Sequence, residues 1–91
     1  HAALLSALGR FHEALHSASE ALRLNPQSAA ALYRMGQALF CLSDLSDALV
    51  CFHRALERDP CSKEIAQAIR VCVLRIKSRK ERRGLYLGPN L

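Results

Sequence analysis

The 91-residue sequence has no tryptophan, and its other aromatic residues are two tyrosines and three phenylalanines. About half of the residues (51%) are apolar, and alanine and leucine dominate among them. This composition favours packed helices over β-sheet, because strands are enriched in β-branched and aromatic residues. No apolar run approaches the roughly 20 residues that cross a bilayer, so no contact with a membrane is predicted.

Catalytic and phosphate-binding motifs are also missing. The sequence has no Gly-x-Ser-x-Gly, no paired-acid motif and no glycine-rich phosphate loop, so we predict a non-enzymatic chain without a cofactor. His12 and His16 lie one helical turn apart and offer two corners of a metal site. No third ligand accompanies them at helical reach, so a solvated helix face is the preferred interpretation and no metal is predicted.

The four cysteines include no Cys-x-x-Cys pair. Their spacings are 10, 10 and 11 residues, from Cys41 through Cys51 and Cys61 to Cys72. Reduced thiols in an intracellular protein, cytoplasmic or nuclear, are the expected state. The sequence shows no initiating methionine and no signal-peptide pattern, and His1 is interpreted as a boundary within a longer protein.

What the sequence does contain is a repeat. Pro26 and Pro60 lie 34 residues apart, and the residues before them match. The other matched pairs are Ala14 and Ala48, Leu15 and Leu49, Ala21 and Ala55, and Leu22 and Leu56. A fixed period of this length in helix-like sequence indicates stacked helical hairpins. The four alanines are expected where antiparallel helices approach closely, with Phe52 filling a wider gap.

Apolar residues spaced by three and four predict five helical segments. They are residues 1–8, 11–24, 28–42, 45–58 and 63–83. Gly9 is expected to break the first segment from the second, and Gly84 to stop the last one. Ser28 and Ser62 are placed to cap the third and fifth segments.

The residues at fixed places in this period resemble the tetratricopeptide repeat family. The matching positions are Leu32, Met35, Gly36, Leu39, Leu45, Ala48, Phe52, Ala55 and Pro60. The resemblance implies an all-α fold in which antiparallel helical hairpins stack as a short solenoid. It divides the chain into a partial repeat with a truncated first helix (1–28), a complete repeat (29–62), a capping helix with a basic end (63–83) and an irregular tail (84–91).

The repeat pattern fails at two places. Gly36, where a small residue lets the second helix approach, becomes Arg70 in the last helix, which is therefore predicted to be the polar cap of the array. The partial repeat is expected to expose Leu4, Leu5 and Leu15, because about three repeats are needed to bury a continuous core. The expected result is either marginal stability or self-association through that edge.

The resemblance places the first helix of each hairpin on a concave, peptide-binding side. The predicted groove residues are Ala30, Tyr33, Arg34, Gln37, Cys41, Glu64 and Gln67, with Val71 beside them. Arg34 and Tyr33 are expected to orient a bound peptide, and Gln37 to hydrogen bond to its backbone. The alternative for Arg34 is a solvated side chain paired with Glu64.

The segment Ala31–Gly36 is similar to a stretch of family members that clamp the acidic C-terminal tail of cytosolic heat-shock chaperones. Arg34 stands where the clamp has an arginine, and a guanidinium can donate two parallel hydrogen bonds to a carboxylate. The clamp lysine would fall at Ala30, so it is missing. A chaperone tail therefore remains an alternative within the broader prediction of a protein or peptide partner.

Positive charge is concentrated in residues 70–83, which carry seven positive charges against one negative. The predicted basic patch is Arg75, Lys77, Arg79, Lys80, Arg82 and Arg83. A solvated helix end is the preferred interpretation, and contact with an acidic partner or a nuclear-targeting role is the next. Nucleic acid is not favoured, because no aromatic residues interleave with these charges to stack on bases.

Overall fold

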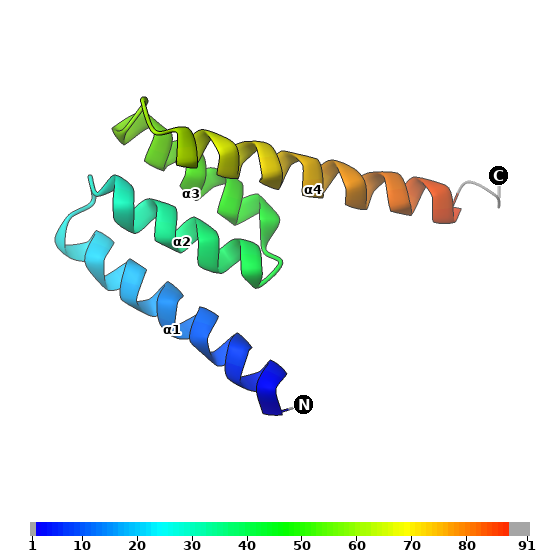
Figure 1. Ribbon diagram of the computed structural model, residues 1–91, viewed down its shortest axis with the longest axis horizontal. Helices are drawn as coiled ribbons and strands as arrows, with labels where there is room; N and C mark the ends of the chain where they lie inside the picture. Colours follow the sequence, from blue (N-terminus) through cyan, green and yellow to red (C-terminus); the bar gives the residue numbers. More distant parts are fainter. Residues whose placement is uncertain (1, 88–91) are drawn as a thin grey trace.

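The structure, a computed structural model, consists of four α-helices packed in chain order (Figure 1). They are α1 (Ala2–Leu24), α2 (Ala29–Cys41), α3 (Leu45–Arg58) and α4 (Lys63–Leu87). The structure describes the backbone of residues 2–87 and the side chains of residues 9–81. Each helix packs against the next, and these residues form no strand. The predicted all-α architecture of stacked hairpins is confirmed.

Two serine caps begin α2 and α4, as predicted. Oγ of Ser28 accepts a hydrogen bond from the backbone N–H of Ala31 at 3.1 Å, and Oγ of Ser62 accepts one from Ile65 at 3.2 Å. Each cap satisfies an N–H group that the first turn of a helix leaves without an intrahelical partner. The turns that contain Pro26 and Pro60 therefore share one local structure, 34 residues apart.

A tight reversal joins α2 to α3. Ser43 adopts a positive φ of 67°, in the left-handed region that favours glycine. Its N–H donates to the carbonyl of Phe40 at 3.0 Å, and the N–H of Asp44 donates to the carbonyl of Leu39 at 2.9 Å. This pair of hydrogen bonds is a Schellman motif, which ends α2 and sends α3 back along it.

The core lies where α3 contacts α2 and α4. Its main buried residues are Leu32, Leu45, Ala48, Phe52, Ala55, Ile65 and Cys72. Ala48 and Ala55 have no exposed surface, and a Cβ at Gly36 would lie 2.5 Å from Cε1 of Phe52. The predicted close approach of helices at Gly36 and the two alanines is confirmed, and so is the role of Phe52 as filler.

The predicted helix break at Gly9 is wrong. Helix α1 runs for 23 residues through this position, and no glycine of the described backbone has a positive φ. A single glycine costs about 1 kcal/mol in a helix interior relative to alanine, and it ends a helix only where the chain adopts a left-handed conformation. The two short helices expected in the partial repeat are therefore one helix.

Because residues 2–24 form one helix rather than that hairpin, no helix of the described residues covers one face of α1. Ala14 and Ala21 are exposed, so the close packing expected at these two alanines is wrong. Leu15 is half-buried rather than exposed. The side chains of Leu4 and Leu5 lie outside the residues that the structure describes.

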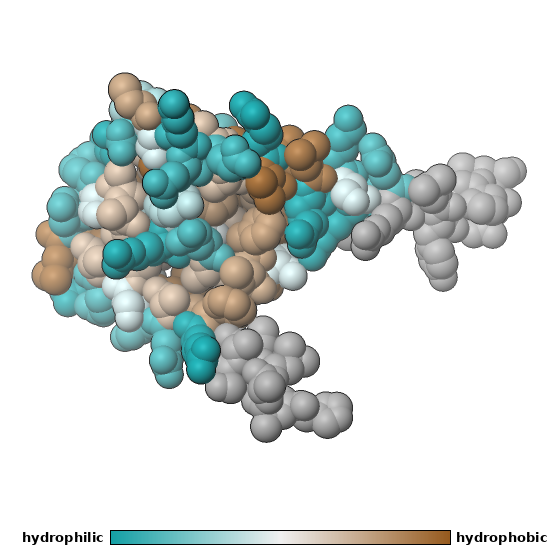
Figure 2. All heavy atoms as spheres, viewed as in Figure 1, coloured by the Kyte–Doolittle hydropathy of each residue, from teal (hydrophilic) through white to brown (hydrophobic). Residues whose placement is uncertain are grey.

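Helix α4 also differs from its prediction. It continues past Gly84 to Leu87, and residues 88–91 lie outside the described backbone. Its outer surface is not the wholly polar one expected of a cap, since Val71, Val73 and Leu74 are 42%, 45% and 60% exposed. Figure 2 shows apolar atoms at the surface over the middle of α4, between hydrophilic side chains. None of the described helices has the length and apolar character that a bilayer crossing requires.

Candidate peptide-binding groove

Helix α2 presents four predicted groove residues on its exposed face. Its buried residues are Ala31, Leu32, Gly36 and Ala38. Its exposed residues include Ala30, Arg34, Gln37 and Cys41. These four follow one another at intervals of three and four residues, so the helical period places them on one side of α2.

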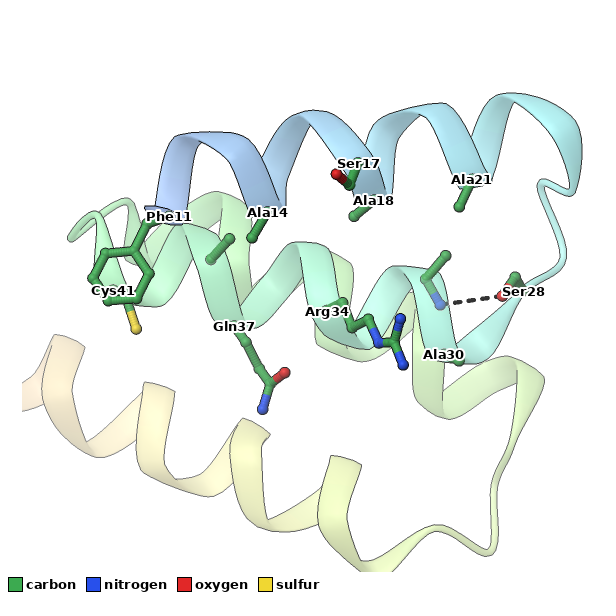
Figure 3. Close-up of a pocket in the computed structure, with 12 residues that line it drawn as sticks. Phe11, Ala14, Ser17, Ala18, Ala21, Ser28, Ala30, Arg34, Gln37 and Cys41 are labelled. Carbon is green, nitrogen blue, oxygen red and sulfur yellow. Dashed lines mark hydrogen bonds between the residues drawn. The ribbon is translucent and has the colours of Figure 1, made fainter. Parts of the chain in front are cut away.

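A first cavity, the α1–α2 cavity, has a volume of about 710 Å³ (Figure 3). From α1 it is lined by Phe11, Ala14, Ser17, Ala18 and Ala21. From α2 and its cap it is lined by Ser28, Ala30, Ala31, Arg34, Gln37, Ala38 and Cys41. Figure 3 shows small side chains of α1 directed toward α2, while Arg34 and Gln37 extend from α2 on the side away from α1. The wall from α1 is apolar except for one serine, and the polar groups come from α2.

A second cavity, the α2–α4 cavity, has a volume of about 280 Å³. It is lined by Tyr33, Gln37, Phe40 and Cys41 of α2, Phe52 of α3, and Glu64, Gln67, Ala68 and Val71 of α4. Gln37 and Cys41 line both cavities. The two hollows therefore flank the exposed face of α2 and form one discontinuous groove.

Every predicted groove residue lines this groove. Ala30 and Arg34 line the α1–α2 cavity, Tyr33, Glu64, Gln67 and Val71 line the α2–α4 cavity, and Gln37 and Cys41 line both. Tyr33 is half-buried, and its ring centroid lies 5.8 Å from that of Phe52 at an interplanar angle of 48°. The core thus holds the ring of Tyr33 in place. The role of these residues in peptide binding stays a prediction.

Arg34 is exposed, as the alternative interpretation of a solvated side chain has it, but the pairing with Glu64 that this alternative included is not formed. Among the side chains of residues 9–81, the only ion pair joins Arg23 to Glu20, at 2.9 Å on α1. The Arg34 guanidinium therefore has its donors directed to solvent, where they are available to a carboxylate.

The predicted basic patch is divided. The guanidinium carbon of Arg75 lies 5.1 Å from the ring centroid of Phe40, and Nη1 of Arg79 lies 3.5 Å from the carbonyl oxygen of Ser43, to which it donates. Both arginines thus contact the fold, while Lys77 and Lys80 are exposed. The side chains of Arg82 and Arg83 lie outside the described residues.

Sequence reasoning missed two aromatic residues of the groove, Phe11 and Phe40. Phe40 lines the α2–α4 cavity and carries the guanidinium of Arg75 on its ring. The signal was present, because Phe40 follows Gln37 by three residues and so shares its helix face. Phe11 lines the α1–α2 cavity because none of the described helices covers that side of α1.

The remaining candidate groups are spread over the surface and the core. His12 and His16 are exposed on α1, and in residues 9–81 no three His, Cys, Asp or Glu side chains are arranged to hold a metal ion. All four cysteines are free; Cys41 and Cys61 are exposed, and Cys51 and Cys72 are buried.

Stacked helical hairpins with a groove along one helix layer define a class of repeat proteins that bind other proteins. Comparison with known proteins identifies the repeat. Residues 29–60 match the sequence model of the tetratricopeptide repeat, so this chain contains a tetratricopeptide repeat, as its period predicted. This repeat is a non-enzymatic protein-interaction fold.

A similar protein is FK506-binding protein 59 of Drosophila melanogaster. The two sequences are 32% identical over 75 residues, which are 81% of this chain and 17% of that protein. The chain therefore spans less than a fifth of the length of this relative.

Proposed function

We propose that the chain is a protein-interaction module that binds a peptide with a carboxylate on the exposed face of α2. The observation that carries this proposal is the placement of Arg34. Its unpaired guanidinium borders a groove whose other polar groups include the amides of Gln37 and Gln67.

The chemistry of the groove favours an extended peptide over a compact ligand. The two cavities are open and lie on either side of α2, and the shared lining residues Gln37 and Cys41 connect them. A side-chain amide both donates and accepts, so Gln37 can hydrogen bond to a peptide backbone. Phe40 and Val71 provide apolar surface in the α2–α4 cavity for a side chain of the peptide.

Binding of an acidic peptide with a free C-terminal carboxylate tests this proposal by calorimetry. Arg34→Ala should weaken binding by about tenfold or more, because a hydrogen bond to a charged group contributes about 1.5–3 kcal/mol. Arg34→Lys should restore part of the affinity, since it keeps the charge but not the planar fork. Amidation of the peptide C-terminus should weaken binding to the unmodified chain more than to Arg34→Ala.

Arg58→Ala is the matched control. Arg58 is an exposed arginine of α3 that lines neither cavity, so its loss should leave the affinity unchanged. Equal binding by the chain and by Arg34→Ala would remove the proposal. Loss of binding on neutralising Lys77 and Lys80 instead would assign the activity to the basic end of α4, and affinity would then fall steeply with salt.

A further inference from the structure

The α1–α2 cavity has a counterpart inside the core. The buried residues of α3 are Leu45, Ala48, Cys51, Phe52 and Ala55. The residues 34 positions earlier are Phe11, Ala14, Ser17, Ala18 and Ala21, and all five line the α1–α2 cavity. On α3 this face is covered by α2 on one side and α4 on the other. Among the described helices only α2 covers this face of α1, so within the described residues the cavity is a vacant helix place.

A second face is left open at the other edge of the stack. Leu39 and Phe40 of α2 pack against the core residues of α3. The residues 34 positions later are Val73 and Leu74 of α4, which are 45% and 60% exposed. The face with which α2 packs on α3 is therefore open on α4.

Through the 34-residue repeat, the open face of α1 corresponds to the face of α3 that α2 covers, and the open face of α4 corresponds to the face of α2 that covers it. We propose that a second copy of this chain docks its α4 into the α1–α2 cavity, head to tail. In this assembly α4 of one copy packs on α1 of the next copy as α2 packs on α3 within a chain. The contact continues the helix layers that each copy already contains, and it covers Val73 and Leu74 with the alanine face of α1.

Residue sizes at the centre of the contact agree with this pairing. Within a chain, Gly36 faces Phe52, with 2.5 Å between a Cβ at the glycine and the ring. At the corresponding positions of the docked faces, Arg70 stands for Gly36 and Ala18 stands for Phe52. In the proposed contact the large residue, Arg70, lies on α4 and the small one, Ala18, lies on α1. The contact therefore avoids the clash that Arg70 would make with a phenylalanine.

Helix lengths agree as well. Helices α1 and α4 have 23 and 25 residues, whereas α2 and α3 have 13 and 14. The N-terminal part of α1 and the C-terminal part of α4 project from the same end of the stack (Figure 1). In an antiparallel contact these two extensions lie alongside each other. The inference does not depend on peptide binding. Because Arg34 lines the α1–α2 cavity, a docked helix and a peptide that reaches Arg34 would compete for this cavity.

The contact joins two different surfaces, so it does not close at a dimer. Sedimentation of the 91-residue chain should show a mass that rises with concentration beyond that of two copies. Two double variants separate the faces. Val73→Glu with Leu74→Glu blocks the α4 face, and Ala14→Glu with Ala21→Glu blocks the α1 face. All four positions are exposed, so both variants should keep the helical circular dichroism of the chain.

Each double variant should self-associate at least tenfold more weakly than the unmodified chain. Mixed in equal amounts, the two variants should form a 1:1 dimer that does not grow, because one intact α4 face meets one intact α1 face. Val50→Glu is the control. Val50 is 50% exposed on α3 and belongs to neither face, so this variant should assemble like the unmodified chain.

Three results would overturn the proposal: a monomeric unmodified chain at all concentrations, undiminished assembly of either double variant, or variants that stay monomeric when mixed. If the Ala14 and Ala21 variant loses helical signal, Ser17→Glu takes its place, since Ser17 is exposed in the same cavity wall.

Discussion

Gly9 and Gly36 are both helical glycines, and their surroundings are opposite. Nothing lies within 4 Å of a Cβ at Gly9, whereas a Cβ at Gly36 would lie 2.5 Å from the ring of Phe52. Gly36→Ala should therefore lower the free energy of unfolding by about 1–3 kcal/mol through overpacking. Gly9→Ala should raise it by up to about 1 kcal/mol. Urea unfolding followed by circular dichroism measures both, and effects of the same sign would contradict the packing around Gly36.

The cysteines divide into two reactive and two protected thiols. Sγ of Cys72 donates to the carbonyl of Leu45 at 3.3 Å, and burial raises the pKa of the Cys51 and Cys72 thiols above 9.0. Because the thiolate is the reactive form, Cys41 and Cys61 should react fast with a disulfide reagent and the buried pair slowly. Urea should make all four react at one rate. Fast reaction of Cys72 in the folded chain would show that its site opens.

The raised pKa values of the Cys51 and Cys72 thiols make the free energy of unfolding depend on pH in the alkaline range. A raised pKa means that the folded chain holds these protons to higher pH than the unfolded chain does. Their contribution is therefore complete below the ordinary thiol pKa of 9.0 and is lost as pH rises from there through the raised value. Urea midpoints should fall above pH 9, and Cys72→Ala should reduce that slope while costing stability at pH 7 through its cavity.

At the scale of the helix, the serine caps set where α2 and α4 begin. Ser28→Ala and Ser62→Ala should each lower the free energy of unfolding by about 1 kcal/mol, because each removes an acceptor for a first-turn N–H. Ser46→Ala is the control, since Ser46 is exposed within α3 and caps nothing. Its effect in urea unfolding should be close to zero, and an equal loss in all three variants would exclude a capping effect.

The sequence predicted α2, α3 and the caps because their signals are local. Apolar spacing, Ser28 and Ser62 each act within one or two turns of chain. The continuity of α1 could not be read in this way. Whether Gly9 ends a helix depends on its backbone conformation, and that depends on whether the preceding segment packs back on α1.

For the groove as well, features of a single helix could be predicted from the sequence, and contacts between helices could not. Helical spacing placed Arg34 and Gln37 on one face of α2, since that is a property of a single helix. The contact of Arg75 with Phe40 and the absence of one between Arg34 and Glu64 depend on how two helices are rotated against each other. That rotation follows from core packing, which periodicity does not specify.

For the whole molecule, the vacant helix place beside α1 predicts the effect of adding a helix. A chimera with a copy of residues Ser28–Asp44 placed directly before Phe11 restores the 34-residue register of the first repeat. The added helix should fill the α1–α2 cavity and bury at least one large apolar side chain. We expect the free energy of unfolding to rise by about 2 kcal/mol or more, with less self-association. A scrambled copy of the added helix, with the same composition, should do neither.

Helix α2 forms a wall of both cavities, and Gln37 and Cys41 face into each. A helix docked on one side and a peptide bound on the other would share these two side chains, so each occupant biases their rotamers for the other. Such coupling is reciprocal: if assembly changes the peptide affinity by some factor, the peptide changes the affinity of assembly by that same factor. Through the single helix α2, the peptide bound by one copy would then be coupled to the number of copies in the assembly.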